Sequence, residues 1–272
     1  MTRDRITITI REDLLKQIDR LQDGISIRSR SQAFEYLLSK ILSDVRLKSA
    51  LVLAGGAKKD ILIKKQPKFL ADISGKTILE RVLNSIHEFN VMNLNVYTDN
   101  FSDEIESFIK SRNQGFDVNF IRGSNASGTI RPLLLAKPNV SGNTFLVAYG
   151  DTLCSLNLNE MLSFHKKNNA LATLALTTVS NPKDFGVVML QGNKINSFVQ
   201  KPKKELGSYL ISAGYCLFEP EIFRHILKSD KSLESDLFPR LAEKGLLFGY
   251  PFQGLYLNIN SESDLQRARV LL

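Results

Sequence analysis

Apolar and polar residues follow two different patterns along this chain, and the change falls near residues 43–49. The shorter part before it holds one alternating segment and two helix-like segments. The longer part after it alternates strand-like and helix-like segments. We therefore expect a small module at residues 1–45 and a larger α/β domain at residues 49–272.

The front module begins with polar and apolar residues in alternation over residues 5–10, which predicts a short strand with isoleucines on one face. Apolar positions then recur at helical spacing over residues 14–21 and 33–41, and Gly24 should end the first helix. One strand and two helices cannot enclose a core this apolar. A second copy that pairs its strand with the first would complete it, so we expect a homodimer or higher oligomer.

Residues 4–42 resemble the ribbon-helix-helix family of DNA-binding domains, of the Arc and MetJ type. The resemblance implies that paired strands enter the DNA major groove and that the second helix holds a DNA phosphate at its N-terminus. The implied base-reading residues are Arg5, Thr7 and Thr9, and the implied phosphate-binding residues are Ser29, Arg30 and Ser31. A module that only dimerises, without DNA, is the alternative.

The larger domain is predicted to start with a buried strand, residues 50–54, which runs into the glycine pair Gly55 and Gly56. The later predicted elements are a helix starting at a Thr77–Glu80 capping box, strands at 95–98, 118–122 and 144–148, helices at 102–110 and 128–137, a hairpin over 185–200 turning at 192–193, and a helix from Ser261. This order predicts the fold class α/β, with an open, mostly parallel Rossmann-like sheet. Ligands of such sheets bind beyond the carboxyl ends of the strands.

Composition narrows the classes of protein that fit. Hydrophobic residues make up 43% and charged residues 24% of the chain, the balance of an ordinary globular protein. No apolar run approaches the ~20 residues of a membrane span, and the N-terminus lacks a signal core, so we expect a cytoplasmic protein without membrane contact. Cys154 and Cys216 lie in strand-like segments and should be reduced core thiols. Two such thiols disfavour thiol chemistry and a zinc cluster, and His87, His165 and His225, far apart in sequence, should be surface or packing residues.

Charge points to an anionic partner. The net charge is +8 and the isoelectric point about 9.4, which favours binding to nucleic acid, nucleotides or phosphorylated metabolites. Five lysines lie in residues 57–68, directly after the glycine pair. Backbone N–H groups at such a turn are unhindered and suit phosphates, although a plain tight turn with a solvated basic loop remains the alternative.

Several segments of the larger domain resemble, in order, the sugar-phosphate nucleotidyltransferases. They are LVLAGG at 51–56, PKFL at 67–70, GKTIL at 75–79, FLVAYGD at 145–151, VQKP at 199–202 (Glu-Lys-Pro in the family), SAGY at 212–215 and LNINS at 257–261. The resemblance covers residues 49–272. It implies that an NTP and a sugar 1-phosphate are joined, with Mg²⁺, to give an NDP-sugar and pyrophosphate.

The resemblance also implies residue roles. The catalytic residues would be Lys68 against the phosphates, Asp151 holding Mg²⁺ and Lys201 holding the sugar phosphate. The other implied contacts are Gly55, Gly56, Lys58, Lys59, Gly128 and Thr129 to the nucleotide, Ala213 and Gly214 to the sugar, and Asn258 to the metal.

Three positions depart from the family pattern. Residues 57–60 read AKKD where the family continues Gly-Thr-Arg, and lysine lacks the bidentate fork of arginine. Asn258 stands at a metal carboxylate position, and residues 128–131 read GTIR in place of Gly-Thr-Ala-Gly. Two hypotheses therefore remain: a Mg²⁺-dependent nucleotidyltransferase, or a DNA-binding regulator whose enzyme-like domain senses a nucleotide or sugar nucleotide without turnover.

Overall fold

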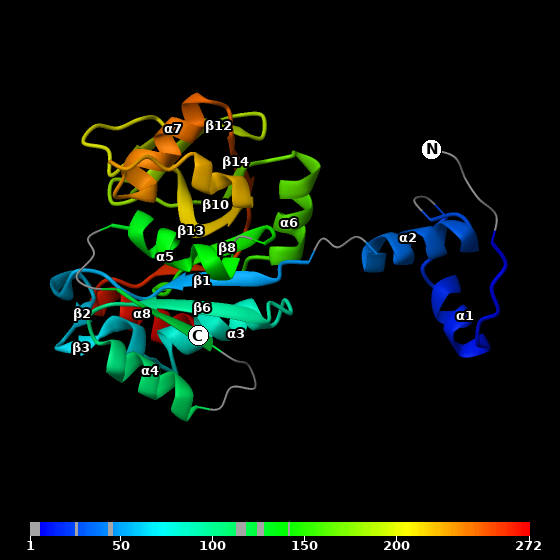
Figure 1. Ribbon diagram of the computed structural model, residues 1–272, viewed down its shortest axis with the longest axis horizontal. Coiled ribbons are helices and arrows are strands. Elements are labelled where there is room, and N and C mark those ends of the chain that lie inside the picture. The colour runs from blue at the N-terminus through cyan, green and yellow to red at the C-terminus, as the bar shows by residue number, and fades with distance from the viewer. Residues whose placement is uncertain (1–5, 25–26, 43–45, 113–117, 124–127, 141) are drawn as a thin grey trace. The chain divides into compact units, whose positions relative to one another are not determined.

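The computed structural model describes residues 6–24, 27–42, 46–112, 118–123, 128–140 and 142–272. The chain divides into two compact units, Met1–Arg46 and Leu47–Leu272 (Figure 1). None of the helices in the described ranges is long and apolar enough to span a bilayer.

The front unit contains two helices, α1 (Glu12–Asp19) and α2 (Arg30–Leu42), so both predicted helices are confirmed. Among the described side chains of this pair, Ile18 and Ala33 are the buried apolar ones. The Arg30 Nε and Nη2 atoms lie 2.7 and 2.9 Å from the two carboxylate oxygens of Asp19, which ties the helices together. The first helix ends at Asp19 rather than at Gly24.

The predicted strand at the start of the front unit is not formed in its described part, residues 6–10. The exposed fractions of Ile6 and Ile8 are 73% and 54%. A β-strand is defined by hydrogen bonds to a neighbouring strand, and no described segment of this single copy forms such bonds with residues 6–10. The ribbon-helix-helix likeness is not shown by this unit, and pairing with a second copy stays a prediction.

In the described residues of the larger unit, nine strands form one sheet in the spatial order β10-β14-β12-β11-β13-β8-β1-β6-β7. The strands are β1 (Ser49–Leu53), β6 (Asn93–Thr98), β7 (Val118–Arg122), β8 (Phe145–Tyr149), β10 (Ala172–Thr178), β11 (Gly186–Gln191), β12 (Lys194–Gln200), β13 (Leu210–Phe218) and β14 (Leu247–Pro251). Strand β1 pairs in parallel with β6 and β8, and β6 pairs in parallel with β7. The parallel part of the sheet therefore has β1 at its centre.

The prediction of an open, mostly parallel sheet is wrong, because the sheet is mixed and partly closed. Strand β13 runs antiparallel to β8, β10 and β11, and β12 runs antiparallel to β11 and β14. The β10–β13 pairing closes β10, β14, β12, β11 and β13 into a ring. The ring can form because β13 is nine residues long: β10 pairs along one edge, while β11 and β8 share the other.

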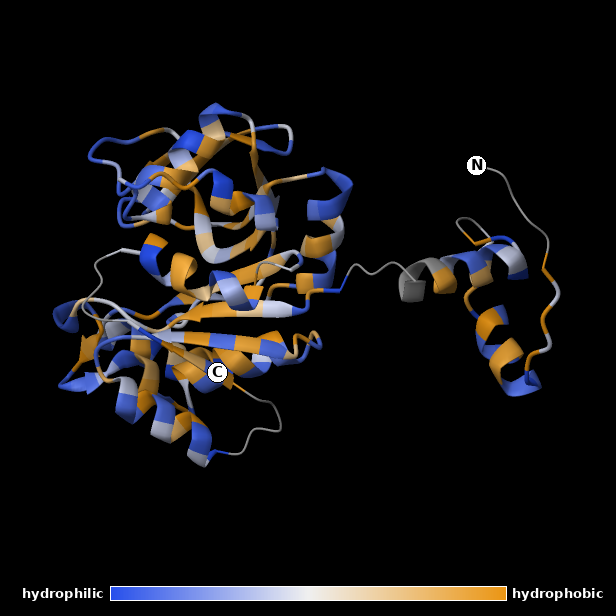
Figure 2. Ribbon diagram, viewed as in Figure 1, coloured by the Kyte–Doolittle hydropathy of each residue, from blue (hydrophilic) through white to orange (hydrophobic). Residues whose placement is uncertain are grey.

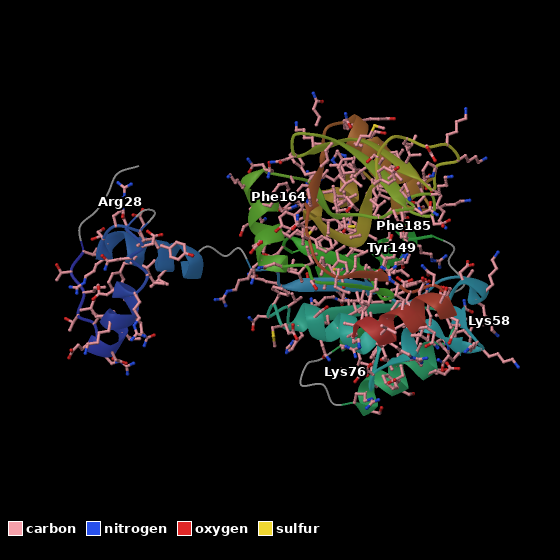
Figure 3. The ribbon with its side chains drawn as sticks, turned by 180° about the vertical axis from the view of Figure 1, so that it is seen from behind. Arg28, Lys58, Lys76, Tyr149, Phe164 and Phe185 are labelled. Atoms are coloured by element: carbon pink, nitrogen blue, oxygen red, sulfur yellow. The ribbon has the colours of Figure 1, made fainter. Side chains whose placement is uncertain are left out.

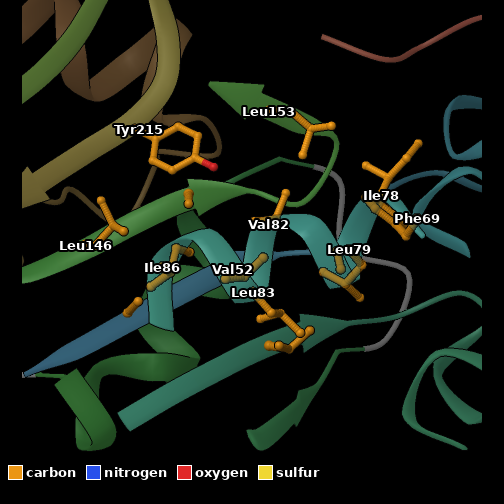
Figure 4. Close-up of a cluster of buried hydrophobic side chains, with 14 of the residues drawn as sticks. Val52, Phe69, Ile78, Leu79, Val82, Leu83, Ile86, Leu146, Leu153 and Tyr215 are labelled. Atoms are coloured by element: carbon orange, nitrogen blue, oxygen red, sulfur yellow. The ribbon is translucent and has the colours of Figure 1, made fainter. Parts of the chain in front are cut away.

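Both faces of the sheet bury apolar side chains, since neighbouring residues of a strand point to opposite faces. On β1, Ala50 and Val52 belong to one core cluster, and Leu51 and Leu53 belong to another. The first cluster packs against α3 (Ile78–His87), α4 (Ser102–Ser111), α6 (Leu158–Lys167) and α8 (Glu262–Leu271), and the second against α5 (Ile130–Val140) and α7 (Phe238–Glu243). Figure 2 shows the apolar strands of this unit, and Figure 4 shows α3 side chains packed beside Val52 and Leu146.

Local signals placed several elements correctly. Thr77 and Glu80 form the predicted capping box at the start of α3, and the Ser261 side chain caps α8 by accepting a hydrogen bond from the Asp264 N–H. The hairpin of β11 and β12 turns at Gly192, whose φ is 60°. The short elements are β2 (Leu62–Ile63), β3 (Gln66–Pro67), β4 (Asp72–Ile73), β5 (Lys76–Thr77), β9 (Thr152–Cys154), β15 (Tyr256–Asn258), η1 (Lys58–Asp60), η2 (Lys68–Leu70), η3 (Pro220–Arg224) and the π-helix η4 (Leu233–Leu237).

Glu219 follows β13 and links this strand to α6 and to the start of β8, because one of its carboxylate oxygens bonds to side chains of both. Its Oε1 atom accepts from Thr144 Oγ1 at 2.9 Å and Lys166 Nζ at 2.6 Å, and lies 3.1 Å from His165 Nε2. Burial works to raise the pKa of Glu219, but the bonds from His165, Lys166 and Thr144 outweigh it and lower the pKa to about 2. A depressed pKa contributes stability above the unfolded-state value of about 4.3, and this contribution is lost as the pH falls toward 2.

Glu219→Gln is therefore expected to lower the free energy of unfolding by about 1–2 kcal/mol at pH 7, and by less at pH 3. Urea unfolding at both pH values measures the difference, with the exposed Glu221→Gln as the control. An equal deficit at the two pH values would show that the charge of Glu219 is not what stabilises the fold.

Candidate active site

A buried ion pair lies at the carboxyl ends of β1 and β8. The Lys68 Nζ atom is 2.6 Å from Asp151 Oδ2, and the exposed fractions of the two side chains are 6% and 14%. Strand pairing explains the position of Asp151, because β8 lies beside β1 and the Gly150 N–H donates to the Leu53 carbonyl at 2.9 Å. Lys68 is placed by η2, where its N–H donates to the Ile61 carbonyl at 2.8 Å.

A second pair of strands, β9 and β15, brings residues 256–260 beside the Lys68–Asp151 ion pair. In the pair β9 and β15, Asn258 lies opposite Thr152, and the Ile259 N–H donates to the Asp151 carbonyl at 3.0 Å. Asn260 Oδ1 accepts from Lys68 Nζ at 2.6 Å, and Asn260 Nδ2 donates to Asn258 Oδ1 at 3.0 Å. These contacts join Lys68, Asp151, Asn258 and Asn260 into one network, which we call the Lys68–Asp151 cluster.

The residues of the cluster that would hold a magnesium ion are Asp151 and Asn258. They offer one carboxylate, Asp151, and one amide oxygen, on Asn258, and Mg²⁺ commonly takes one or two protein oxygens together with phosphate oxygens and water. Within the described ranges, no group of three or more His, Cys, Asp or Glu residues could hold a metal by itself. With these donors, a bound ion would take its remaining ligands from phosphate oxygens and water.

A cavity of about 220 Å³ opens beside the cluster. Its wall is formed by Tyr149, Asp151, Thr152, Asp184, Phe185, Gly186, Phe198, Gln200, Lys201, Ser212, Gly214, Glu234, Phe238, Tyr256, Asn258 and Asn260. The volume is below the ~300–1,000 Å³ of sites for drug-sized ligands, so it suits one small polar ring. Figure 3 labels Tyr149 and Phe185, two aromatic side chains of this wall.

Two of the predicted sugar-phosphate contacts lie in the wall. Lys201 is exposed at the cavity, with its backbone held at a φ of 45° and its N–H bonded to the Phe185 carbonyl at 2.9 Å. Gly214 has a φ of 75°, and a Cβ atom there would lie 3.2 Å from Tyr149 Cδ2. Ala213 is fully buried in the core and does not line the cavity.

The carboxylate of Asp99 accepts a hydrogen bond from the backbone of the glycine pair, a contact that the sequence did not predict. The Gly56 N–H donates to both oxygens of Asp99, at 3.0 and 3.1 Å, and the Asn100 side chain donates to the Gly56 carbonyl at 2.9 Å. Gly55 lacks room for a side chain, since a Cβ atom there would lie 2.7 Å from the Tyr97 ring. Asp99 therefore takes the place that a phosphate was predicted to hold at Gly56.

Lys58 and Lys59 are exposed in η1, and Lys58 Nζ lies 5.5 Å from the centre of the Phe101 ring. Neither lysine belongs to the cavity wall. Gly128 and Thr129 also lie outside the wall, but the Thr129 hydroxyl donates to Oε2 of Glu234, which does line it. The cavity wall thus contains Asp151 and Lys201, and Lys68 reaches it only through its ion pair with Asp151, while the predicted nucleotide contacts lie outside the wall.

The candidate DNA-binding residues lie in the front unit. Thr7 and Thr9 are exposed in the segment 6–10, and Arg5 falls outside the described residues. Ser29 precedes α2, its Oγ accepting from the Gln32 N–H at 3.3 Å, and Ser31 is exposed. Arg30 is held by Asp19, so a DNA phosphate would compete with that carboxylate.

The two thiols carry no chemistry at the site. Cys154 and Cys216 are free, and burial raises the pKa of Cys154 to about 12 and that of Cys216 further. Both remain protonated at neutral pH. Cys154 lies in β9 and Cys216 in β13, as the sequence predicted.

Fold and site together define an α/β protein with a charged ligand cavity beyond the ends of parallel strands. The nucleotidyl transferase family model matches residues 49–255, and the chain belongs to this family. Mannose-1-phosphate guanylyltransferase catalytic subunit beta of Danio rerio and that of Xenopus tropicalis are each 29% identical over 223 residues, covering 79% of this chain. The chain spans 62% of the length of these relatives.

A solved structure shares the fold. HddC from Yersinia pseudotuberculosis, complexed with GMP-PN, has a TM-score of 0.70 and 22% sequence identity, and the match covers 83% of this chain and 99% of that one. At this identity the likeness shows the fold alone. The α/β part of the fold-class prediction is confirmed.

Proposed function

We propose that the larger unit joins an NTP to a sugar 1-phosphate, giving an NDP-sugar and pyrophosphate. The observation that carries the proposal is the Lys68–Asp151 cluster bordering a small polar cavity whose wall also contains Lys201. Family membership supports the reaction class. The names of the similar proteins make GTP and mannose 1-phosphate the first substrates to test.

In this mechanism the protein positions two anionic substrates and neutralises their charge, which supplies most of the rate in phosphoryl-type transfer. Lys68 lies against the nucleotide phosphates and Lys201 grips the phosphate of the sugar. Asp151 and Asn258 would hold Mg²⁺, which neutralises charge on the phosphate oxygens. The buried position of Lys68, with 6% of its side chain exposed, strengthens its attraction for a phosphate oxygen.

The test is pyrophosphate release with each common NTP and each of several sugar 1-phosphates. We expect release only when both substrates and Mg²⁺ are present. Thermal melting with the same ligands separates the alternatives: a sensor would be stabilised by a nucleotide or sugar nucleotide and release no pyrophosphate.

Both the enzyme and the regulator hypotheses require a bound nucleotide, and Asp99, whose carboxylate accepts from the Gly56 N–H, bears on whether one binds at this turn. Asp99→Asn removes a negative charge from the predicted phosphate position. We expect nucleotide affinity to rise several-fold, measured by calorimetry, with Asp103→Asn on the exposed face of α4 as the control. Unchanged or weaker binding would mean that the charge of Asp99 does not oppose the nucleotide.

For the front unit we propose dimerisation, with DNA binding as its further role. The support is the set of exposed apolar side chains, Ile6, Ile8, Leu14, Leu21, Tyr36 and Leu38. A second copy that covers them would also pair the segment at residues 6–10. Sedimentation of the intact protein at micromolar concentration should show no monomer, and a predominantly monomeric protein would contradict the proposal.

DNA binding would depend on Arg5, Thr7, Thr9 and Arg30. Its hallmark would be an affinity that falls with added salt, because bound lysines and arginines release counterions from DNA.

A further inference from the structure

Glu234 is an acidic residue of the cavity wall that has no role in the proposed mechanism. It lies in η4, the π-helical turn after Ser232, and faces the same cavity as Asp151 and Lys201. Its side chain is partly buried. Asp184, another carboxylate of the wall, is exposed at the rim, and Asp151 is engaged by Lys68.

Two hydroxyl groups fix one oxygen of Glu234. The Oε2 atom accepts from Thr129 Oγ1 at 2.9 Å and from Ser232 Oγ at 2.5 Å. Thr129 Oγ1 in turn accepts from the Leu233 N–H at 2.7 Å, and Ser232 Oγ accepts from the Glu234 N–H at 3.1 Å. Each hydroxyl therefore both receives and donates a bond, which leaves the carboxylate little freedom to turn.

The segment that carries Thr129 is itself held against the chain before η4. The Ile130 N–H donates to the Lys231 carbonyl at 3.1 Å. Gly128 has a φ of 95°, and a Cβ atom there would lie 2.1 Å from the same carbonyl oxygen. The Ile130 N–H and the close approach at Gly128 thus hold the Thr129 hydroxyl in place beside Glu234.

A fixed carboxylate is selective about its ligand. When ionised it only accepts hydrogen bonds, so it needs donors and repels phosphate. Ring hydroxyls of a sugar are such donors. The basic side chains, Lys201 in the wall and Lys68 in the cluster, provide the attraction for phosphate. A sugar phosphate can satisfy both demands only with its hydroxyl-bearing ring toward Glu234 and its phosphate toward the lysines.

The sequence adds an independent reason. Residues 199–202 read VQKP, so the wall carries the neutral amide of Gln200 where the resembling segment of the family carries a glutamate. The Gln200 Oε1 atom is buried and has no hydrogen-bond partner within the described structure. The acidic acceptor of the inner wall is accordingly Glu234.

We propose that Glu234 is a specificity-determining residue that accepts hydrogen bonds from ring hydroxyls of the sugar phosphate, and that Thr129 is its positioning residue. This inference rests on the proposed function for the identity of the ligand class. It changes the assignment of Thr129, which acts through Glu234 rather than on the nucleotide.

The test is calorimetric binding of mannose 1-phosphate, glucose 1-phosphate and their singly deoxygenated analogues to the intact protein with Mg²⁺. Charge-assisted hydrogen bonds are worth enough that Glu234→Gln should weaken binding of the preferred parent sugar about tenfold or more. At least one deoxy analogue should bind the wild type more weakly than its parent, and Glu234→Gln should erase that difference. Thr129→Val should act in the same direction with a smaller effect, and it serves as the second variant if Glu234→Gln unfolds.

Glu205→Gln, an exposed glutamate away from this cavity, is the matched control and should bind like the wild type. Nucleotide affinity should stay within about twofold in Glu234→Gln, which separates a sugar contact from general damage. Equal binding of all sugars to the wild type and both variants, or no sugar phosphate binding at all, would overturn the inference. Sugar binding that depends on Glu234 without pyrophosphate release would instead count against the proposed reaction alone.

Discussion

Asp151→Asn is expected to lower turnover at least about a hundredfold, because it removes the carboxylate of the Lys68–Asp151 cluster. The asparagine keeps the shape of the side chain but offers Mg²⁺ a neutral oxygen, so the Mg²⁺ concentration for half-maximal rate should also rise. Initial rates of pyrophosphate release across a Mg²⁺ titration measure both effects.

Asn258→Asp is the matched opposite change, since it adds a carboxylate to the same cluster. We expect it to lower the Mg²⁺ requirement. Melting temperatures of both variants must be close to that of the wild type for the comparison to hold. An Asp151→Asn protein that turns over at the wild-type rate would remove Asp151 from the mechanism.

Lys68→Met is expected to reduce kcat/KM for the NTP about a hundredfold or more, since it deletes the buried cation that the proposed mechanism sets against the nucleotide phosphates. Methionine fills much of the space of the lysine stem, which limits the loss of packing. Steady-state kinetics with varied NTP at saturating sugar phosphate measure the change.

Lys64→Met is the control, because Lys64 lies in the same basic loop but is exposed and paired with Glu262 at 2.8 Å. It should leave kcat/KM within about twofold of the wild type. Equal losses in the two variants would mean that the loop's total charge, rather than Lys68, governs nucleotide use.

Much of the fold could be predicted because its signals are local. The Thr77–Glu80 capping box, the turn at Gly192 and the Ser261 cap each need only a few neighbouring residues. The strand directions could not be predicted in this way. The ring depends on β13 pairing with three strands, and on a register shift between Leu174 and Leu176 of β10 that no local pattern encodes.

The candidate site likewise contains residues that could be predicted from local sequence and residues that could not. Lys68, Asp151 and Lys201 stand in segments that resemble the family, so the presence of Asp151 and Lys201 in one cavity wall, with Lys68 paired to Asp151, could be expected. Asp99 and Glu234 were missed, because neither stands in such a segment and each reaches its partner across a long stretch of sequence. The one signal for Asp99 was its position directly after β6, the strand that pairs with β1 beside the glycine pair.

The most direct measurement of the central claim is mass-spectrometric analysis of the products formed from GTP and mannose 1-phosphate, with other NTPs and sugar 1-phosphates in parallel. The proposed reaction predicts an NDP-sugar and pyrophosphate in equal amounts, formed by the wild type only with both substrates and Mg²⁺, and reduced at least about a hundredfold in Asp151→Asn. No NDP-sugar from any substrate pair at any Mg²⁺ concentration would contradict it.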